Sequence, residues 1–486
     1  MSIPPEAFFL DPAAEGTKQL QIRETVARGV LSGRFQPGVK LPSSRGLAKH
    51  LGISRITVTL AYTELLADDY ITTRDRSGYY ISENAPVSPR FQPNATRSED
   101  FDWGRKLTTR TSESVQLSKP SDWRSYDYPF IYGQADESLF DRASWRLCAI
   151  RALGAKDFED ISADQFDQDD ARLVQFIADH TLPRRGIQAG PDEILITLGA
   201  QNALWLAAQL LLTQRRRAAI ENPCYPALRD LLAGTRCHVS AINVDSDGLP
   251  PHALPPDTDV VFTTPSHQCP TTRTMPLERR KALLKAAGDE DFLIVEDDYE
   301  FEMSFLKPPS PALKSLDTTG RVIYVGSFSK SLFPGIRLGY LVGAPDFIAE
   351  ARRLRSAVLR HPPGLLQRTV AYFLSLGHFD AMNRRIATAF RQRRVALDDT
   401  IAASSLKIAG RGRFGGSSVW MQAPAHIDTV DLARHLQPEK VLIEPGAPFF
   451  SNPSPPKNFY RLAYSSIPAA QIPEGLGRIE RTIAKM

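Results

Sequence analysis

The sequence has few cysteines and no long apolar segment. Its 486 residues include 4 cysteines, which are scattered and form no Cys-x-x-Cys pair. A disulfide framework or a cysteine-ligated zinc site is therefore not expected. No apolar run is long enough to cross a bilayer, and no signal-peptide pattern is present. These absences predict a cytoplasmic protein that holds no metal and has no membrane partner.

The formal net charge is only +4, but it is unevenly distributed. Residues 17–82 carry ten lysines and arginines against five aspartates and glutamates. A basic excess confined to one end of a chain indicates an anionic partner for that end. The length predicts two or three domains.

The basic end has the pattern of three short helices. Apolar residues recur at helical spacing from Leu20 to Leu31, where Gly33 breaks the pattern. Ser43 or Ser44 is expected to cap a second helix, and Ser54 a third that continues to about Asp68. In this third helix we expect five apolar residues to share the buried face, namely Ile56, Leu60, Ala61, Leu65 and Leu66. Helix, tight turn and helix form a helix-turn-helix arrangement.

Two β-like runs follow, over residues 70–73 and 78–81, and the basic residues 74–77 join them as a candidate wing. The alternative is a three-helix packing unit with an incidental charge bias. Residues 33–70 resemble the winged helix-turn-helix of GntR-type bacterial regulators along their whole length. That resemblance implies that these residues lie at or near double-stranded DNA: Ser43, Ser44, Arg45, Ser54, Arg55, Thr57, Tyr62 and the wing glycine Gly78.

The chain divides by composition into three parts. We expect a DNA-binding domain over residues 15–82 and a connector over residues 83–100, which has several prolines and no periodicity. The third part, residues 101–486, alternates short β-branched strands with helical stretches. The strands are expected near residues 193–197, 218–221, 260–263, 292–296 and 321–325. This alternation predicts an α/β fold with a largely parallel sheet, and ligands of such sheets bind at the carboxyl ends of the strands.

Lys330 stands in Ser327-Phe328-Ser329-Lys330, directly after one such strand, and Arg337 follows. A lysine amine condenses with an aldehyde, while hydroxyls and an arginine hold a phosphate. Pyridoxal 5′-phosphate (PLP) is the cofactor that needs both. The alternative for Lys330 alone is a solvated surface lysine.

Asp297 and Tyr299 follow another strand and favour the PLP hypothesis. On an extended strand end, residues i and i+2 face the same side. A carboxylate there keeps a pyridine nitrogen protonated, and a tyrosine hydroxyl is a partner for the 3-oxygen of the ring. The alternative is an acidic solvent loop. Gly199 opens a strand-to-helix turn suited to phosphate, and Tyr225 stands at a further strand end, where it either stacks on the ring or packs in the core.

The two halves together resemble the MocR family, in which a GntR-type module is joined to a fold-type I aminotransferase-like domain with a smaller C-terminal α+β part. By this resemblance Lys330 is the Schiff-base lysine, Asp297 the pyridine-nitrogen partner, Tyr299 the 3-oxygen partner and Tyr225 the stacking ring. The phosphate would be held by Gly199, Ala200, Gln201, Ser327 and Arg337. Arg461 matches the arginine that binds the carboxylate of an amino acid, with a structural salt bridge as the alternative. His267 is a hydrogen-bond partner of the cofactor or a buried structural histidine.

The sequence departs from the family pattern at several positions. Cys269 stands where most members have an aromatic residue, and Thr272 where most have glycine. Residues 165–170 lack the usual glycine, and Val174 replaces an arginine. We expect these changes near the substrate entrance, where they affect the identity of the effector and any transaminase turnover. The unusual segment is similar to that of MocR-type regulators of taurine or ectoine catabolism.

The resemblance implies a homodimeric transcription regulator that senses an amino compound. Such an effector would displace Lys330 from PLP as an external aldimine and shift the populations of two arrangements that differ in DNA affinity. One alternative is an active aminotransferase with a DNA-binding appendage. The other is a DNA-binding protein with a vestigial cofactor site.

Overall fold

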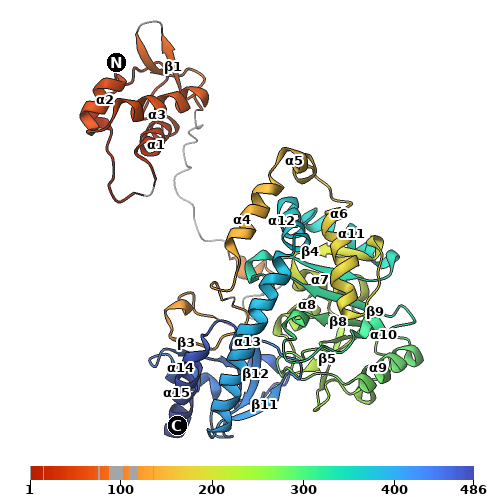
Figure 1. Cartoon of the computed structure of the whole chain (residues 1–486). Coiled ribbons are helices and arrows are strands. Elements are labelled where there is room, and N and C mark those ends of the chain that lie inside the picture. Colours follow the sequence, from red (N-terminus) through yellow and green to blue (C-terminus); the bar gives the residue numbers. More distant parts are fainter. Residues whose placement is uncertain (1, 15, 75–76, 87–101, 109–118, 135) are drawn as a thin grey trace. The chain divides into compact units, whose positions relative to one another are not determined.

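The computed structural model describes residues 2–14, 16–74, 77–86, 102–108, 119–134 and 136–486. The chain divides into two compact units, residues 1–109 and residues 110–486 (Figure 1). Most of the expected connector, residues 83–100, lies outside the described residues. In the described part of the chain, no helix combines the length and apolar character needed to cross a bilayer.

The smaller unit is a helix-turn-helix followed by an antiparallel hairpin. Its elements are α1 (Lys18–Leu31), α2 (Ser44–Leu51), α3 (Arg55–Ala67), β1 (Ile71–Arg74) and β2 (Gly78–Ile81). Ser43 caps α2 by accepting from the backbone N–H of Gly46, and Ser54 caps α3 by accepting from that of Thr57. Both caps satisfy N–H groups that the helix itself cannot pair.

The core of the smaller unit differs in part from the periodicity prediction. Ile56 is 72% exposed and Leu60 is 48% exposed, so the prediction that they face inward is wrong. Val58 and Tyr62 are buried in their place. A three-helix unit has too little interior for every apolar residue of α3, and packing against α1 and α2 selects the buried face.

Seven of the described strands form the main sheet of the larger unit, in the order β4-β10-β9-β8-β7-β5-β6. All run parallel except β10, which is antiparallel to both β4 and β9. Their bounds are β4 Ile194–Thr197, β5 Arg217–Asn222, β6 His238–Asn243, β7 Val260–Thr263, β8 Leu293–Asp298, β9 Val322–Ser327 and β10 Gly339–Val342. The five strands expected from sequence are thus confirmed to within a few residues.

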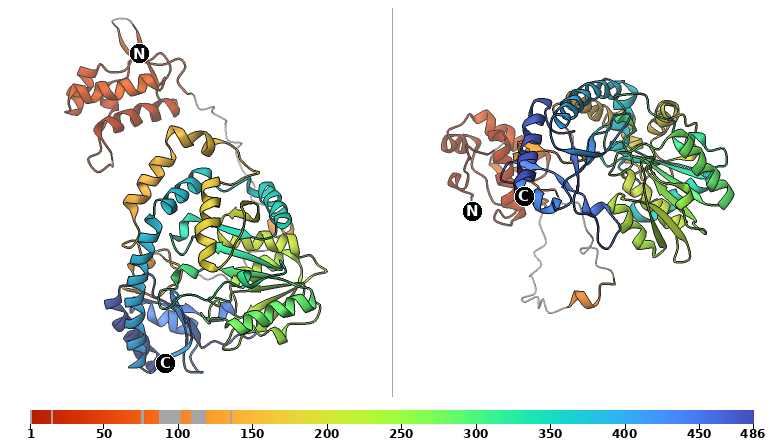
Figure 2. Two further views of the ribbon diagram at one scale, coloured as in Figure 1. Left: turned by 45° about the vertical axis from the view of Figure 1, so that its right-hand side comes forward. Right: turned by 90° about the horizontal axis from the view of Figure 1, so that it is seen from below.

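Helices cover both faces of this sheet (Figure 2). One apolar layer joins the sheet to α7 (Gly199–Leu211), α8 (Pro226–Thr235) and α11 (Pro345–Leu359). Helices on the other face include α9 (Leu277–Glu290) and α10 (Leu313–Leu316). A third apolar cluster joins the β4–β10 side to α4 (Arg142–Ala152), α6 (Ala171–Phe176) and α12 (Gly364–Ser375). The helix α5 (Ala155–Ser162) contacts α12.

The C-terminal part is a smaller α+β layer, as expected. Its antiparallel sheet has the order β11-β12-β15-β14, with bounds β11 Lys407–Arg411, β12 Ser418–Gln422, β15 Phe459–Ala463 and β14 Glu444–Pro445. A short parallel pair joins β13 (Val441–Leu442) to β3 (Tyr128–Pro129). One apolar core packs this sheet against α13 (His378–Ala402), α14 (Thr429–Leu436) and α15 (Ile472–Lys485).

Candidate functional site

The neighbouring strands β8 and β9 bring an acid and an amine to one edge of the main sheet. Asp297 pairs with Val325 in their parallel register, and Lys330 follows the end of β9. Burial, with the negative charges of Asp298 and Glu221, raises the pKa of Asp297 to about 7. Among the described residues, Oδ1 of Asp297 has no hydrogen-bond partner although it is buried. A buried unpaired carboxylate oxygen fits a protonated ring nitrogen.

Asp298 has a different environment because successive side chains of a strand face opposite sides. It accepts hydrogen bonds from Nε of Arg185 at 2.7 Å and from the hydroxyl of Tyr324 at 2.9 Å. Burial raises its pKa, but the contact with Arg185 outweighs this and the pKa is lowered overall. Asp298 is therefore held in the scaffold through its Oδ2, although its Oδ1 is also buried and unpaired among the described residues. The side chain of Asp297 makes no hydrogen bond or ion pair in the described part of the chain, which leaves it for a ligand.

The amine of Lys330 lies 4.0 Å from the ring centroid of Tyr132. Burial lowers its pKa to about 8; the carboxylate of Glu300 opposes this shift, and the cations of Lys119 and Arg461 add to it. A larger fraction of this amine is neutral near pH 7 than of an ordinary lysine, and the neutral form is the nucleophile.

Arg461, on β15, lies beside the same aromatic ring. Its guanidinium carbon is 4.0 Å from the centroid of Tyr132, and its Nε donates to Oε2 of Glu444 at 2.8 Å. The ammonium of Lys119 lies 3.6 Å from Oε1 of Glu444 and donates to the backbone carbonyl oxygen of Tyr132. The structural salt bridge considered for Arg461 therefore exists, and its guanidinium lies against the same Tyr132 ring as the amine of Lys330.

The expected phosphate residues converge at the first turn of α7. Gly199 has φ +77°, and a β-carbon there would stand 3.3 Å from Nη2 of Arg337. Strand β10 joins the ends of β4 and β9 at this site, because its Gly339 pairs with both Thr197 of β4 and Ser327 of β9. A helix N-terminus with free N–H groups, a hydroxyl and an arginine suit a phosphate dianion. Ala200 and Gln201 continue this turn.

Tyr225, Tyr299 and His267 lie near the carboxyl end of β8. Tyr299 donates its hydroxyl hydrogen to the backbone carbonyl of His267 at 2.8 Å, and Tyr225 lines a small cavity together with Asp297. Neither ring nitrogen of His267 has a hydrogen-bond partner within the described ranges, and burial lowers its pKa. The two alternatives for His267 therefore both stay open.

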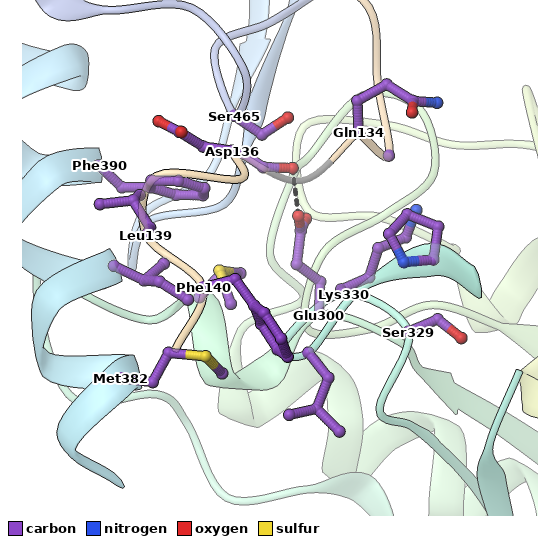
Figure 3. A pocket seen from close by; sticks show the side chains of 16 residues that line it. Gln134, Asp136, Leu139, Phe140, Glu300, Ser329, Lys330, Met382, Phe390 and Ser465 are labelled. Atoms are coloured by element: carbon purple, nitrogen blue, oxygen red, sulfur yellow. Dashed lines mark hydrogen bonds between the residues drawn. The ribbon is translucent and has the colours of Figure 1, made fainter. Parts of the chain in front are cut away.

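The pocket beside Lys330 is mostly apolar, with polar groups on one side (Figure 3). Apolar side chains from α13 and from the chain before α4 line it, including Leu139, Phe140, Met382 and Phe390. Glu300 faces Lys330 and accepts a hydrogen bond from Ser417. An apolar wall with few polar groups is typical of a small-molecule site.

Sequence reasoning missed Tyr132, Lys119, Glu444 and Glu300. Glu300 directly follows the Asp-x-Tyr motif, and Tyr132-Gly133 follows a buried apolar run, so local signals existed for both. Nothing near Lys119 or Glu444 in the sequence indicates that the two meet, because the contact joins segments far apart in the chain.

The departures from the family pattern have different structural consequences. Thr272 is buried and has φ +57°, a left-handed conformation that a β-branched residue adopts at a cost. Cys269 packs in an aromatic cluster with Trp420 and Phe449. Asp169 accepts hydrogen bonds from Arg352 and Arg355, which are structural contacts. Residues 165–170 and Val174 are not among the residues that line the pocket of Lys330 in this chain, and their place near the substrate entrance stays a prediction.

In the smaller unit, the first turns of α2 and α3 expose several of the expected DNA-contacting residues. Arg45 and Arg55 are exposed, as are the capping Ser43 and Ser54. Thr57 is half-buried, and its hydroxyl lies 2.9 Å from that of Ser54. The wing glycine Gly78 has φ +108° at the turn of the hairpin.

Two residues of that set are buried and act within the fold. Tyr62 is fully buried and its hydroxyl donates to the backbone carbonyl of Pro42 at 3.0 Å. Ser44 accepts a hydrogen bond from Nε of Arg55 at 3.3 Å. Both side chains therefore position the exposed residues of α2 and α3.

Family models match both units of the chain. The model for aminotransferase class I and II matches residues 159–479, and the model for bacterial regulatory proteins of the gntR family matches residues 18–81.

Known regulators are similar over nearly the whole chain. The HTH-type transcriptional regulator TauR of Rhodobacter capsulatus is 56% identical over 483 residues, which cover 99% of this chain and 100% of that protein. The probable rhizopine catabolism regulatory protein MocR of Rhizobium meliloti is 28% identical over 97% of this chain and 95% of that protein. The HTH-type pyridoxine biosynthesis transcriptional regulator PdxR of Corynebacterium glutamicum is 31% identical over 78% and 77%.

Solved aminotransferases share the fold of the larger unit. The α-aminoadipate aminotransferase LysN from Thermus thermophilus, complexed with N-(5′-phosphopyridoxyl)-L-leucine, superposes with a TM-score of 0.71 at 26% identity, over 79% of this chain and 99% of that one. An archaeal alanine:glyoxylate aminotransferase has a TM-score of 0.71 at 23% identity, over 79% and 100%, and shows the fold alone.

The fold, the two family models and the relatives define a DNA-binding transcription regulator whose larger domain has the fold-type I aminotransferase architecture. The chain belongs to the MocR family of regulators.

Proposed function

We propose that this regulator binds PLP at Lys330 and uses it to sense an amino compound, whose binding changes the affinity of the smaller unit for its operator. The main support for the proposal is that two unusual groups occur together. The amine of Lys330 has a pKa of about 8, and the carboxylate of Asp297 has a buried oxygen without a hydrogen-bond partner among the described residues. They stand at the ends of adjacent parallel strands. A surface lysine has neither feature.

Different residues of the site would bind different parts of the cofactor. Asp297 would supply a negative charge for the ring nitrogen and Tyr225 a flat surface. Tyr299 would supply a hydroxyl for the 3-oxygen by turning its hydrogen away from the backbone carbonyl of His267. The first turn of α7, with Ser327 and Arg337, would bind the phosphate. When bound, PLP supplies an aldehyde that reacts reversibly with amines.

An effector amine would compete with Lys330 for that aldehyde. Glu300 faces Lys330 in the same pocket and is placed to hold the amine as an ammonium once it is released. The site then changes its charge and its contacts, which is what a shift between two populated states requires. Arg461 is the group proposed to bind the acidic end of the effector.

The regulated pathway that fits best is taurine catabolism. The sequence of residues 165–170 is similar to that of regulators of taurine or ectoine catabolism. The relative with 56% identity is named TauR, which favours taurine. We propose that the chain acts as a homodimer, so that two smaller units bind paired half-sites of an operator.

The test combines spectroscopy with DNA binding. Purified protein mixed with PLP is expected to gain a visible absorbance band that borohydride fixes at Lys330, and Lys330→Ala is expected to lack it. Taurine is expected to shift this band and the operator affinity of the wild type only. Absence of the band in the wild type, or its persistence in Lys330→Ala, would contradict the proposal.

The alternative function is a working aminotransferase. The family match and the intact set of Lys330, Asp297 and Arg461 favour it. Repeated conversion of an amino compound and a keto acid would support the enzyme, whereas a stable spectral change without turnover supports the sensor.

A further inference from the structure

Helix α3 of the smaller unit (Figure 1) presents apolar side chains on its exposed face. Ile56 is 72% exposed and Leu60 is 48% exposed, and residues four apart on a helix are neighbours on one face. Thr59 and Thr63 lie beside them. Their hydroxyls donate to the backbone carbonyl oxygens of Arg55 and Thr59 at 3.0 Å, so both are engaged within the helix. The exposed face of α3 therefore offers mainly apolar groups to a partner.

This exposure is not relieved by the interior of the smaller unit. Val58 and Tyr62 occupy the buried side of α3, so Ile56 and Leu60 have no place there. A single exposed apolar residue is ordinary, but two that adjoin on the second helix of a helix-turn-helix mark a contact surface. In this motif the second helix is the one that enters the major groove of DNA.

Basic side chains border the apolar face at the start of α3. Arg55 is exposed, and its Nε donates to Oγ of Ser44 at 3.3 Å, which joins the first turns of α2 and α3. Arg45, next to Ser44, and Lys49 are exposed as well. Duplex DNA offers phosphates to such cations and base edges to the surface between them. The surroundings therefore favour DNA over a second copy of this chain as the partner of the apolar face.

The major groove of DNA has one apolar group, the 5-methyl group of thymine. The other base edges there present hydrogen-bond donors and acceptors, which an isoleucine side chain cannot pair. The residues at the N-terminus of a recognition helix contact base edges, and Ile56 is the second residue of α3.

We propose that Ile56 reads the 5-methyl group of a thymine in the operator, and that Leu60 extends this apolar contact by one helical turn. Each operator half-site then has thymine at one fixed position, selected by an apolar contact and not by a hydrogen bond. This inference rests on operator binding by the smaller unit, and it is independent of PLP and of the effector.

The experiment replaces single thymines by deoxyuridine, which lacks only the methyl group. The full-length wild-type protein first selects its preferred duplexes from a random pool, and fluorescence anisotropy then measures its affinity for a selected duplex and for each substituted one. Deoxyuridine in place of the contacted thymine is expected to weaken binding about fourfold, the equivalent of one buried methyl group. Ile56→Ala should bind the thymine duplex at least about fourfold more weakly than the wild type, and should bind both duplexes equally.

Two further variants and the salt dependence separate this contact from a general loss of binding. Leu31→Ala removes an exposed leucine of α1 and should keep both the wild-type affinity and the loss on deoxyuridine. Ile56→Val keeps two methyl groups and should keep most of the preference for thymine. Ile56→Ala should not change the slope of log affinity against log salt, because it removes no charge. Arg55→Ala should reduce this slope by about one.

The role of Ile56 is overturned if no deoxyuridine substitution weakens the wild type more than it weakens Ile56→Ala. It is also overturned if Ile56→Ala keeps its DNA affinity but changes the association state in analytical ultracentrifugation, since the apolar face would then join two copies of the chain. A wild type that selects no sequence from the pool would overturn operator binding itself, and the inference with it. Sequence-selective binding without any effect of the methyl group would leave operator binding intact and refute the inference alone.

Discussion

Gly133 lies so close to Lys330 that a β-carbon added to it would stand 2.7 Å from Nζ. Gly133 also has φ +74°, a backbone conformation that other residues rarely adopt. The chain after β3 therefore passes directly over the amine that we propose to carry PLP. A β-carbon at this position would displace the amine of Lys330 from its present place, and the positive φ itself favours glycine.

Gly133→Ala is accordingly expected to hinder the capture of PLP by Lys330, since the added methyl group displaces Nζ from its present position. The visible band should be lost or formed at least about tenfold more slowly, and the strained φ should cost about 1 kcal/mol of folding free energy. Gly288→Ala in α9 is the control, because nothing lies within 4 Å of its β-carbon. It should stabilise the protein by up to about 1 kcal/mol and leave the band unchanged. Normal cofactor capture by Gly133→Ala would contradict the proposed approach.

The rate at which the protein binds PLP is expected to vary with pH in proportion to the neutral fraction of the Lys330 amine. With a pKa of about 8, the neutral fraction of its amine rises about fivefold between pH 7 and pH 8 and less than about twofold from pH 8 to pH 9. Stopped-flow measurement of the band formation rate tests this profile. Glu300→Gln removes a charge that favours the ammonium, so its profile should move to lower pH. An identical profile in the two proteins would mean that Glu300 does not act on Lys330.

Because the pKa of Asp297 is raised, we expect the stability of the cofactor-free protein to depend on pH. This pKa is raised from 3.8 to about 7, so the folded state keeps a proton that the unfolded state releases between these values. Stability is therefore lost as the pH rises from about 4 to about 7 and stays lower above that. Asp297→Asn lacks this titration and should gain stability over the wild type across the same window, as seen by denaturant unfolding. A constant difference between the two proteins would refute the raised pKa.

Thr272 is expected to limit stability through its backbone. A non-glycine residue with positive φ costs about 1–3 kcal/mol, and Thr272 is β-branched. Thr272→Gly should raise the free energy of unfolding by about 1 kcal/mol, part of the gain being offset by lost side-chain burial. The neighbouring Thr271, whose hydroxyl donates to Gln268, has no positive φ among the described residues. Thr271→Gly should therefore destabilise the protein, and the same sign for both variants would contradict the strain argument.

Arg55 is expected to contribute to operator binding alone. It is exposed at the first turn of α3, where a recognition helix meets base edges or phosphates. Arg55→Ala should cost about 1–3 kcal/mol of binding free energy in a titration with operator DNA. The PLP band should be unchanged. Arg28→Ala, on α1 and paired with Glu24, is the control that should bind normally. Loss of the band in Arg55→Ala would mean that the two units are not separable.

The sequence by itself determined the local structure and the chemistry of the main residues. Apolar runs, capping serines and turn glycines are local signals, so the strands that carry Asp297 and Lys330 and the caps of α2 and α3 were predictable. The resemblance to the MocR family correctly identified both domains.

Only the tertiary structure decided which residues meet across the fold. Lys119, Tyr132 and Glu444 surround Arg461 and Lys330 although long stretches of chain separate them, and no local pattern encodes such a contact. The burial of Tyr62 in place of Ile56 was likewise set by the competition of side chains for a small interior. Local propensity depends on neighbouring residues, whereas ion pairing and burial depend on how distant segments pack.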